Sequence, residues 1–285
     1  MARRSRHGLA GQRRPRLQRP TRRNLGLGRR ALADRQRRRR ADAKTLGGAA
    51  YDAALDVLVL HGGSQAPTIT AMRRQWLWGR QRLVAGRSVN PGARDHLSMV
   101  YDAARQQIVM YGGQYFPTSR FYRDTWTWDA GGWMQTDARA PDVRYHYAMA
   151  YDAARQQALV FGGANNRGDL NDLWAWNGEA WVVIDRGTGP ARRSGVRMAF
   201  DELDGVMVLF GGRTGQSALD DTWLWDGETW TEYESDQAPP ARSHHAMAYD
   251  RVRHKIVLFG GYGADNYGDT WEWDMTGGWV EAGGG

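Results

Sequence analysis

The chain has 285 residues and no cysteine, so disulfide bonds, thiolate metal sites and cysteine nucleophiles are excluded. No apolar run approaches the roughly 20 residues of a membrane-spanning helix. The formal net charge of +8 is unevenly distributed: residues 1–44 hold 16 Arg and one Lys against two Asp, a net +15. The remaining chain has 22 basic and 29 acidic residues, a net −7, so the basic character belongs to the N-terminal segment alone.

Residues 1–44 have few apolar residues and no periodicity, with their densest basic run at residues 37–40, and this composition predicts a disordered tail. No apolar segment of a secretory signal follows the basic residues, so a cytoplasmic location is the default expectation. One hypothesis makes the tail a nucleic-acid-binding arm that contacts phosphates. The alternative is a solvated or spurious extension, which is favoured because basic runs are weak motifs.

Residues 144–181 contain the clearest structural unit. The apolar runs YAMAY and QALVFGG alternate with period two and are separated by a turn at residues 152–156. After the polar loop ANNRGDLN come LWAWN and AWVVI, joined by Asn177-Gly178, a strong hairpin signal. The segment therefore predicts four short antiparallel strands, which cannot bury both faces of their sheet without neighbours.

The same unit recurs along the chain with a period of 49 to 50 residues. Its Tyr-Asp or Phe-Asp pair begins at Tyr51, Tyr101, Tyr151, Phe200 and Tyr249. A diglycine follows at Gly62, Gly112, Gly162, Gly211 and Gly260, and a Trp-x-Trp pair begins at Trp76, Trp126, Trp174, Trp223 and Trp271. A closing tryptophan ends four repeats, at Trp133, Trp181, Trp230 and Trp279. These positions include all 14 tryptophans, which we expect to pack between sheets rather than to bind ligands.

A period near 50 with four strands per unit is typical of a β-propeller. The motifs HxxxxYD, VLFGG and DTWxWDG followed by Trp resemble the kelch repeat over about residues 44–285. The resemblance implies an all-β, kelch-type propeller of about five four-stranded blades around a central channel. Expected blade boundaries are about 45–87, 88–137, 138–186, 187–236 and 237–285, after a tail at 1–44. Five blades could close directly or belong to a larger ring.

The first repeat departs from the pattern. Residues 74–83 read RQWLWGRQRL, so Arg74 replaces Asp and Leu83 replaces the closing tryptophan. Some codon choices for Arg80 to Val84 encode Gly-Asn-Val-Trp when the reading frame is shifted by one base. The shifted frame would restore the motif that the first repeat lacks. A frame error around residues 73–87, and upstream of residue 44, is therefore a hypothesis that the codons would test. On the sequence as it stands, the first blade is predicted to be the least stable.

The loops between the second and third strands differ completely from repeat to repeat, whereas the other turns are short and nearly invariant. Variable loops on a rigid frame are where binding residues concentrate. The candidates for a ligand-binding face are Tyr115, Phe116, Arg120, Phe121, Asn165, Asn166, Arg167, Arg213, Gln216, Tyr262, Asn266 and Tyr267. The loop of the second repeat is the best anchor, because aromatic residues surround Arg120 and exposed aromatics beside Arg are typical of binding hot spots. The alternative is that these aromatics fold back onto the blades.

The last four repeats each have an arginine at the start of the first strand, and three of these arginines are followed two residues later by histidine. This predicted channel-mouth ring consists of Arg94, Arg144, Arg193, Arg242, His96, His146 and His244. Such arginines could bind an acidic or phosphorylated ligand. Structural pairing with the aspartates that open the third strands is the favoured alternative, because the pattern recurs once per blade. The histidines are too dispersed for a chelating pair within one strand, so no metal site is expected.

The sequence shows no nucleophile beside a base, no phosphate-binding glycine loop and no carboxylate dyad. The copper site of galactose oxidase, a relative of this fold, includes a cysteine-modified tyrosine, so that chemistry cannot be transferred to a chain without cysteine. The expected function is a non-catalytic binding module for a protein segment or a glycan, without cofactor or metal. The alternatives are a cofactor-free carbohydrate-active enzyme of the epimerase type, with its site at the channel mouth, and nucleic-acid contact through the tail.

Overall fold

The structure is a computed structural model that describes residues 47–65, 70–71, 75–79 and 91–283. The chain divides into two compact units, residues 1–42 and residues 43–285, and every described residue belongs to the second. The described residues form β-strands and turns, with one short 3-10 turn at Phe116–Thr118. Among them, no helix has the length and hydropathy needed to cross a lipid bilayer.

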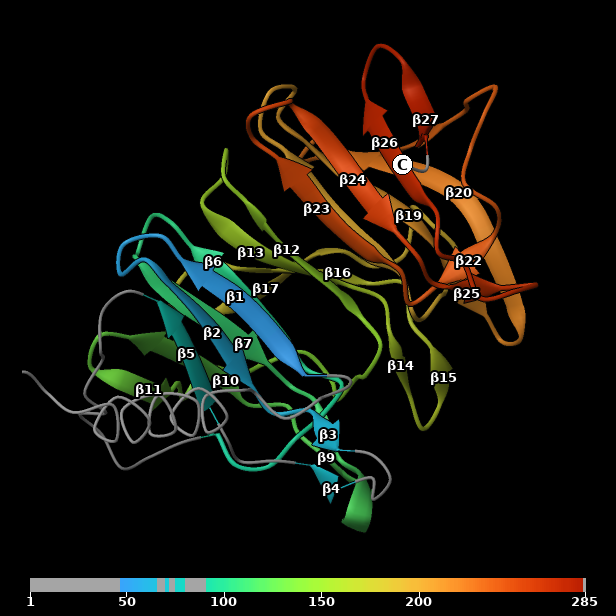
Figure 1. The fold of residues 1–285 in the computed structure, drawn as a ribbon. Coiled ribbons are helices and arrows are strands. Elements are labelled where there is room, and N and C mark those ends of the chain that lie inside the picture. The colour runs from blue at the N-terminus through green and yellow to red at the C-terminus, as the bar shows by residue number, and fades with distance from the viewer. Residues whose placement is uncertain (1–46, 66–69, 72–74, 80–90, 284–285) are drawn as a thin grey trace, which may run out of the picture. The chain divides into compact units, whose positions relative to one another are not determined.

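The main strands form five antiparallel sheets, one for each repeat (Figure 1). Blade 1 contains β1 (Gly48–Asp52), β2 (Val57–His61) and β5 (Gln75–Gly79). Blade 2 contains β6 (Ser98–Asp102), β7 (Gln107–Tyr111), β10 (Thr125–Asp129) and β11 (Gly132–Gln135). Blade 3 contains β12 (Ala148–Asp152), β13 (Gln157–Phe161), β16 (Leu173–Trp176) and β17 (Trp181–Asp185).

Blade 4 contains β18 (Arg197–Asp201), β19 (Val206–Thr214), β20 (Ser217–Trp225) and β21 (Trp230–Tyr233). Blade 5 contains β23 (Ala246–Asp250), β24 (Lys255–Phe259), β26 (Thr270–Asp274) and β27 (Gly278–Ala282). The predicted β-propeller is therefore confirmed, with four complete four-stranded blades and three described strands in blade 1. The position of a fourth strand in blade 1 falls in residues 80–90, outside the described residues.

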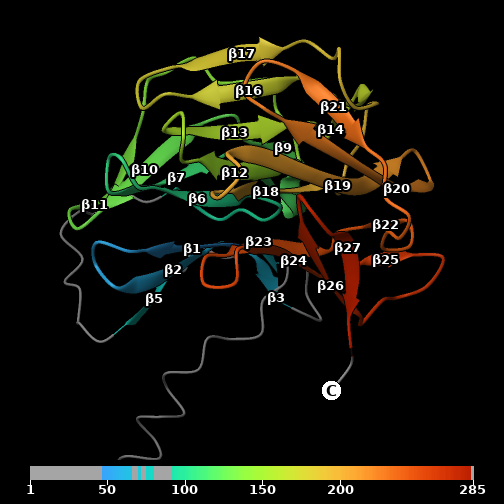
Figure 2. The same cartoon turned by 90° about the horizontal axis from the view of Figure 1, so that it is seen from above.

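The first strand of each blade is the innermost one, and consecutive inner strands contact one another in the order β1, β6, β12, β18 and β23. Seen from above, blade 3 runs outward from β12 through β13 and β16 to β17 (Figure 2). The inner strands carry small or flexible apolar residues, and Ala148, Ala150 and Met198 among them are buried. The sheets thus pack face to face around a common centre.

The loops between second and third strands carry short hairpins of their own, which leave the blades at the end where the first strands begin. These are β3 (Ser64–Gln65) with β4 (Thr70–Ala71), β8 (Gln114–Tyr115) with β9 (Arg120–Phe121), and β14 (Ala164–Asn165) with β15 (Gly168–Asp169). In blade 4 the hairpin is continuous with β19 and β20, and in blade 5 β25 (Tyr262–Gly263) pairs with β22 (Arg242–Ser243). We call this end of the propeller the loop end.

Each closing tryptophan packs against the preceding blade. Trp181 lies 5.3 Å from the ring of Tyr111, at the end of β7, and Trp230 lies 5.3 Å from Phe161, at the end of β13. Trp279 repeats the contact with Phe210, at 5.2 Å. Burying such large apolar surfaces is the main favourable term in folding. The tryptophans therefore join the blades, as the sequence predicted.

The opposite end of the propeller, where first and second strands are joined, is held by repeated contacts between turns. The backbone N–H of Ala104 in blade 2 donates to the Tyr151 hydroxyl of blade 3 at 3.2 Å. Arg105 of the same turn donates to the carbonyl of Asn177, in the turn between β16 and β17. Arg155 makes the same contact with Asp226 of blade 4. This end is therefore scaffold, and we call it the turn end.

Two expectations cannot be compared with the structure. The disordered tail at residues 1–44 and most of the frame-error segment at 73–87 lie outside the described residues. Because residues 1–44 have few apolar residues to bury, we predict that deleting them leaves the thermal midpoint of unfolding nearly unchanged.

Candidate binding surface at the loop end

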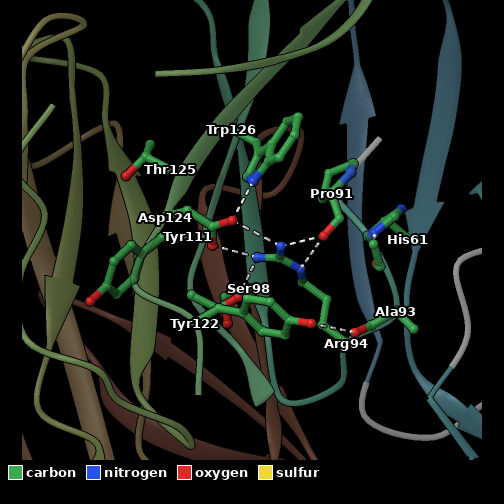
Figure 3. Close-up of polar contacts among 12 residues, drawn as sticks. His61, Pro91, Ala93, Arg94, Ser98, Tyr111, Tyr122, Asp124, Thr125 and Trp126 are labelled. Carbon is green, nitrogen blue, oxygen red and sulfur yellow. Dashed lines mark hydrogen bonds and ion pairs between the residues drawn. The ribbon is translucent and has the colours of Figure 1, made fainter. Parts of the chain in front are cut away.

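In four blades the arginine at the start of the repeat is buried in a network with an aspartate of its own blade, and Figure 3 shows the network of Arg94. Arg94 donates from Nη1 to Asp124 Oδ1 at 2.7 Å and from Nη2 to Asp124 Oδ2 at 3.0 Å. It also donates to the Gly112 carbonyl at 2.9 Å, and Trp126 Nε1 donates to Asp124 Oδ2 at 2.7 Å. The same bidentate pairing recurs in Arg144–Asp172, Arg193–Asp221 and Arg242–Asp269.

This pairing controls the electrostatics of the repeat. Burial by itself would raise the pKa of Asp124 and Asp172, but the guanidinium and indole hydrogen bonds lower it below the ordinary value. The hydrogen bond from Arg242 lowers the pKa of Asp269 to about 2. Since the arginines are at most 1% exposed, they offer a ligand almost no surface. Their role is the structural pairing that the sequence favoured over a ligand-gripping ring.

A groove of about 600 Å³ opens at the loop end of blade 2. One wall is the connection at residues 91–94, and the other is the hairpin β8–β9 with Tyr115, Arg120 and Tyr122. Tyr122 is fixed by its hydroxyl, which donates to the Ala93 carbonyl at 3.3 Å. The centroid of its ring lies 4.0 Å from the guanidinium carbon of Arg94 and 5.0 Å from that of Arg120. The groove therefore combines aromatic surface with an exposed cation.

A row of ring contacts crosses the loop end from blade 2 to blade 5. Phe121 stacks on Tyr145, and the row continues through the histidines of three blades to Tyr262. Along the row the centroid distances are 5.7 Å for Phe121–Tyr145, 5.0 Å for Tyr145–His146, 4.4 Å for His146–His244 and 4.9 Å for His244–Tyr262. His96 contacts His146 from the side, at 4.5 Å. Phe121 therefore folds back onto blade 3, whereas Tyr262 keeps 39% of its surface exposed.

The remaining predicted loop residues lie at the same end but apart from the groove. Asn166, Arg167, Gln216 and Asn266 are exposed at the tips of the hairpins of blades 3, 4 and 5. Asn165 is half-buried and its side chain caps the hairpin, accepting from the backbone N–H of Arg167 at 2.8 Å. Tyr267 is half-buried beneath Arg242, with its ring 4.2 Å from the guanidinium carbon. Arg213 is half-buried, and Phe116 begins the 3-10 turn.

His96, His146 and His244 meet at the centre of the loop end. The sequence did not predict this contact, because its pattern was considered only for histidine pairs within one strand. Burial lowers the pKa of His146 to about 2, and the neighbouring charges of His96, His244 and Arg213 lower it further. Burial likewise lowers the pKa of His244 to about 4. Arg197 of blade 4 lines the same centre and was also missed. The sequence signal for Arg197 is that the other blades have small residues at this repeat position, namely Gly48, Ser98, Ala148 and Ala246.

Within the part of the chain that the structure describes, no group of three or more His, Asp or Glu is arranged to hold a metal ion. The clustered histidines contact one another through their ring faces and edges. The chemistry available at the loop end is therefore aromatic contact, hydrogen bonding and positive charge.

Comparison with known proteins supports the repeat assignment. Residues 120–281 match the family model described as the KLHDC2/KLHL20/DRC7 Kelch-repeats domain. A search of curated proteins found no match. The family match covers more than half of the chain and includes β9, β10 and β11 of blade 2 and all of blades 3 and 4 and nearly all of blade 5, where the Arg–Asp pairs and closing tryptophans recur. The chain belongs to the KLHDC2/KLHL20/DRC7 family of Kelch-repeat β-propellers.

Proposed function

We propose that the protein binds a segment of a partner protein at its loop end, with the groove of blade 2 as the anchor. Kelch propellers commonly act as protein-interaction modules, which supports the general role. The observation that carries the specific proposal is the groove of about 600 Å³ between residues 91–94 and the hairpin β8–β9. Its size lies within the range of about 300–1,000 Å³ in which proteins bind compact ligands.

The groove favours a segment that pairs an apolar or proline residue with an acidic one. Tyr115 supplies aromatic surface, and the exposed Arg120 supplies a cation that is free of a carboxylate partner among the described residues. Asp124, by contrast, has both oxygens occupied by Arg94 and Trp126. An acidic side chain of the partner would therefore meet Arg120, while an apolar side chain would lie against Tyr115 and Tyr122.

The test is selection from a random peptide library on the full-length protein. Peptides retained by the wild type should lose at least tenfold in affinity when Tyr115 and Arg120 are both replaced by Ala, because an aromatic and an Arg anchor are removed together. The matched control replaces Arg251 and Val252 by Ala. These residues lie on the turn end of blade 5, where Val252 is 88% exposed.

Selected peptides that bind the double variant as well as the wild type would place the site elsewhere. Loss of binding in the Arg251 and Val252 control would place it at the turn end. A glycan array on the same proteins provides the remaining comparison: glycan binding that depends on Tyr115 and Arg120, with no selected peptide, would replace the protein segment by a sugar ligand.

A further inference from the structure

The histidines of blades 2, 3 and 5 occupy one repeat position, and their backbone there is strained. His96, His146 and His244 have φ of 51°, 55° and 59°, in the left-handed region. Blade 4 has Gly195 at this position, with φ of 67°. Glycine adopts this conformation without steric cost, whereas a residue with a Cβ does not. Three blades therefore keep an imidazole where glycine fits the backbone better, and strain of this kind gathers at functional sites.

The glycine of blade 4 is also what allows the three rings to meet. A Cβ at Gly195 would lie 2.6 Å from Cε1 of His244, so His244 occupies the space that a fourth side chain would need. The rings of His96 and His244 each contact that of His146, at 4.5 Å and 4.4 Å. Together with Arg197 they enclose a cavity of about 60 Å³, which we call the histidine pocket.

The histidine pocket contains the guanidinium charge of Arg197 and imidazole nitrogens whose hydrogen-bonding capacity the protein uses only in part. The side chain of Arg197 makes one hydrogen bond among the described residues, to the Val196 carbonyl at 2.9 Å. Nδ1 of His146, which lines the pocket, is buried without a hydrogen-bond partner, and so is Nε of Arg213, which lies outside the pocket lining. Among the described residues one carboxylate, Asp95, contacts the cluster: its Oδ1 lies 2.9 Å from His96 Nδ1, and its Oδ2 is buried without a hydrogen-bond partner. Buried charges and polar groups are costly unless they are paired, so the pocket is suited to an anion.

The volume and the directions of the donors define the class of anion. A bound water needs roughly 10–15 Å³, so about 60 Å³ holds a group of a few heavy atoms but no sugar ring. The imidazole and guanidinium groups come from blades 2, 3, 4 and 5 and approach from different sides. A carboxylate has two oxygens in one plane and suits a single guanidinium fork. A phosphoryl group has oxygens in several directions, each of which accepts hydrogen bonds.

We propose that the histidine pocket binds a phosphoryl group, through Arg197 and the imidazoles of His96, His146 and His244. The group belongs either to free inorganic phosphate or to a phosphorylated side chain of a peptide, because both present the same oxygens. The proposal is independent of the groove at blade 2, since the two sites share no lining residue.

Each test variant copies the residue that another blade carries at the same position. His146→Gly copies Gly195, and Arg197→Ala copies Ala148 and Ala246. His146→Gly relieves the left-handed strain and removes a buried imidazole, so the variant is expected to fold with unchanged or higher stability. Arg251→Ala, at an exposed arginine of the turn end, is the control for charge.

Isothermal titration of the full-length protein with inorganic phosphate, at constant ionic strength in sodium chloride, measures the affinity. The expected result is saturable phosphate binding whose affinity falls at least tenfold in both His146→Gly and Arg197→Ala, but not in Arg251→Ala. In a separate thermal denaturation, phosphate should raise the melting temperature of the wild type. Titration with a short phosphoserine peptide distinguishes the sources: tighter binding than free phosphate assigns a phosphorylated segment, and equal or weaker binding assigns the free ion.

Three results would overturn the proposal. The first is that the wild type binds neither phosphate nor the phosphoserine peptide at millimolar concentration, a result that requires no variant to fold. The second is equal phosphate affinity in Arg197→Ala and the wild type. The third is acetate binding as tightly as phosphate, which would assign the pocket to carboxylates instead.

Discussion

At the scale of single residues, the loop end is governed by two kinds of buried polar group. The arginines of the repeats are ionised and have bidentate aspartate partners. The central histidines are held neutral, since burial lowers the pKa of His146 to about 2, that of His244 to about 4 and that of His245 well below its ordinary value. The two kinds respond differently to mutation and to pH.

Replacing Asp172 by Ala is expected to destabilise the protein by about 3–5 kcal/mol, because it leaves the buried charge of Arg144 without its partner. Chemical denaturation of the variant and the wild type measures the difference. The control is Glu202→Ala, which removes an ion pair with Arg251 that is largely exposed and should cost at most about 1 kcal/mol. Similar costs for the two variants would contradict the structural role of the buried pairs.

Acid is expected to destabilise the fold below pH 6.5. The folded state keeps His146, His244 and His245 neutral, whereas the unfolded chain protonates them near their ordinary pKa of 6.5. Their contribution is therefore complete above pH 6.5 and is lost as the pH falls from 6.5 toward 4, with a slope of up to about 1.4 kcal/mol per pH unit for each histidine.

Denaturation midpoints in phosphate-free buffer at pH 7.5 and pH 5 test this acid dependence. The paired aspartates do not contribute to the difference between the two midpoints. The pKa values of Asp124, Asp172 and Asp269 are lowered, so these groups stay ionised between pH 7.5 and pH 5. His146→Gly should show a shallower decline than the wild type. A midpoint that does not change between the two pH values would refute the assignment of neutral buried histidines.

At the scale of the blade, the closing tryptophans differ in one hydrogen bond. Trp181 Nε1 donates to Thr125 Oγ1 at 2.8 Å, and Trp279 Nε1 donates to Thr222 Oγ1 at 2.9 Å. Blade 3 has Leu173 where blades 2 and 4 have these threonines, and Nε1 of Trp230 is buried without a partner. The packing contact is therefore common to all three positions, while the polar contact is present at two.

This difference predicts unequal effects of one substitution. Trp181→Phe and Trp279→Phe should each destabilise the protein by about 1 kcal/mol more than Trp230→Phe, because only the first two remove a buried hydrogen bond. Trp230→Phe is the control that removes no hydrogen bond; because Trp230 is half-buried while Trp181 is 6% and Trp279 1% exposed, lost ring burial adds to the expected difference. Equal losses in equilibrium unfolding at all three positions would show that the hydrogen bond contributes nothing measurable.

At the scale of the whole propeller, the blades differ in how many of their faces are covered. Blade 3 packs against blade 2 on one face and blade 4 on the other, and its Phe161 is completely buried. The equivalent residue of blade 5, Phe259, is 55% exposed. Stability in repeat structures depends on such contacts between neighbours.

Amide hydrogen exchange should therefore be slowest in β13 of blade 3 and at least tenfold faster in β24 of blade 5, whose outer face is open. Mass spectrometry of peptides covering the two strands measures this directly. The strands have the same length and the same position in their sheets, so each serves as the reference for the other. Equal protection in β13 and β24 would mean that the whole propeller opens only by global unfolding.

The sequence by itself determined the repeat, the strands and the end of the propeller that varies. Alternating apolar residues, diglycines and Trp-x-Trp pairs are local signals, and a short period in sequence translates directly into strands and turns. The pairing of each repeat arginine with Asp124, Asp172, Asp221 or Asp269 also followed from the sequence, because both partners recur once per blade.

Only the tertiary structure decided what lies at the centre. His96, His146 and His244 are 50 and 98 residues apart, and their contact depends on blade packing and on the space left by Gly195. Arg197 enters the same pocket from a position where other blades have small residues. The groove at Tyr115 and Arg120 likewise needs the wall at residues 91–94, which precedes the hairpin by some 20 residues. Convergence of this kind is set by the packing of sheets, which no local pattern encodes.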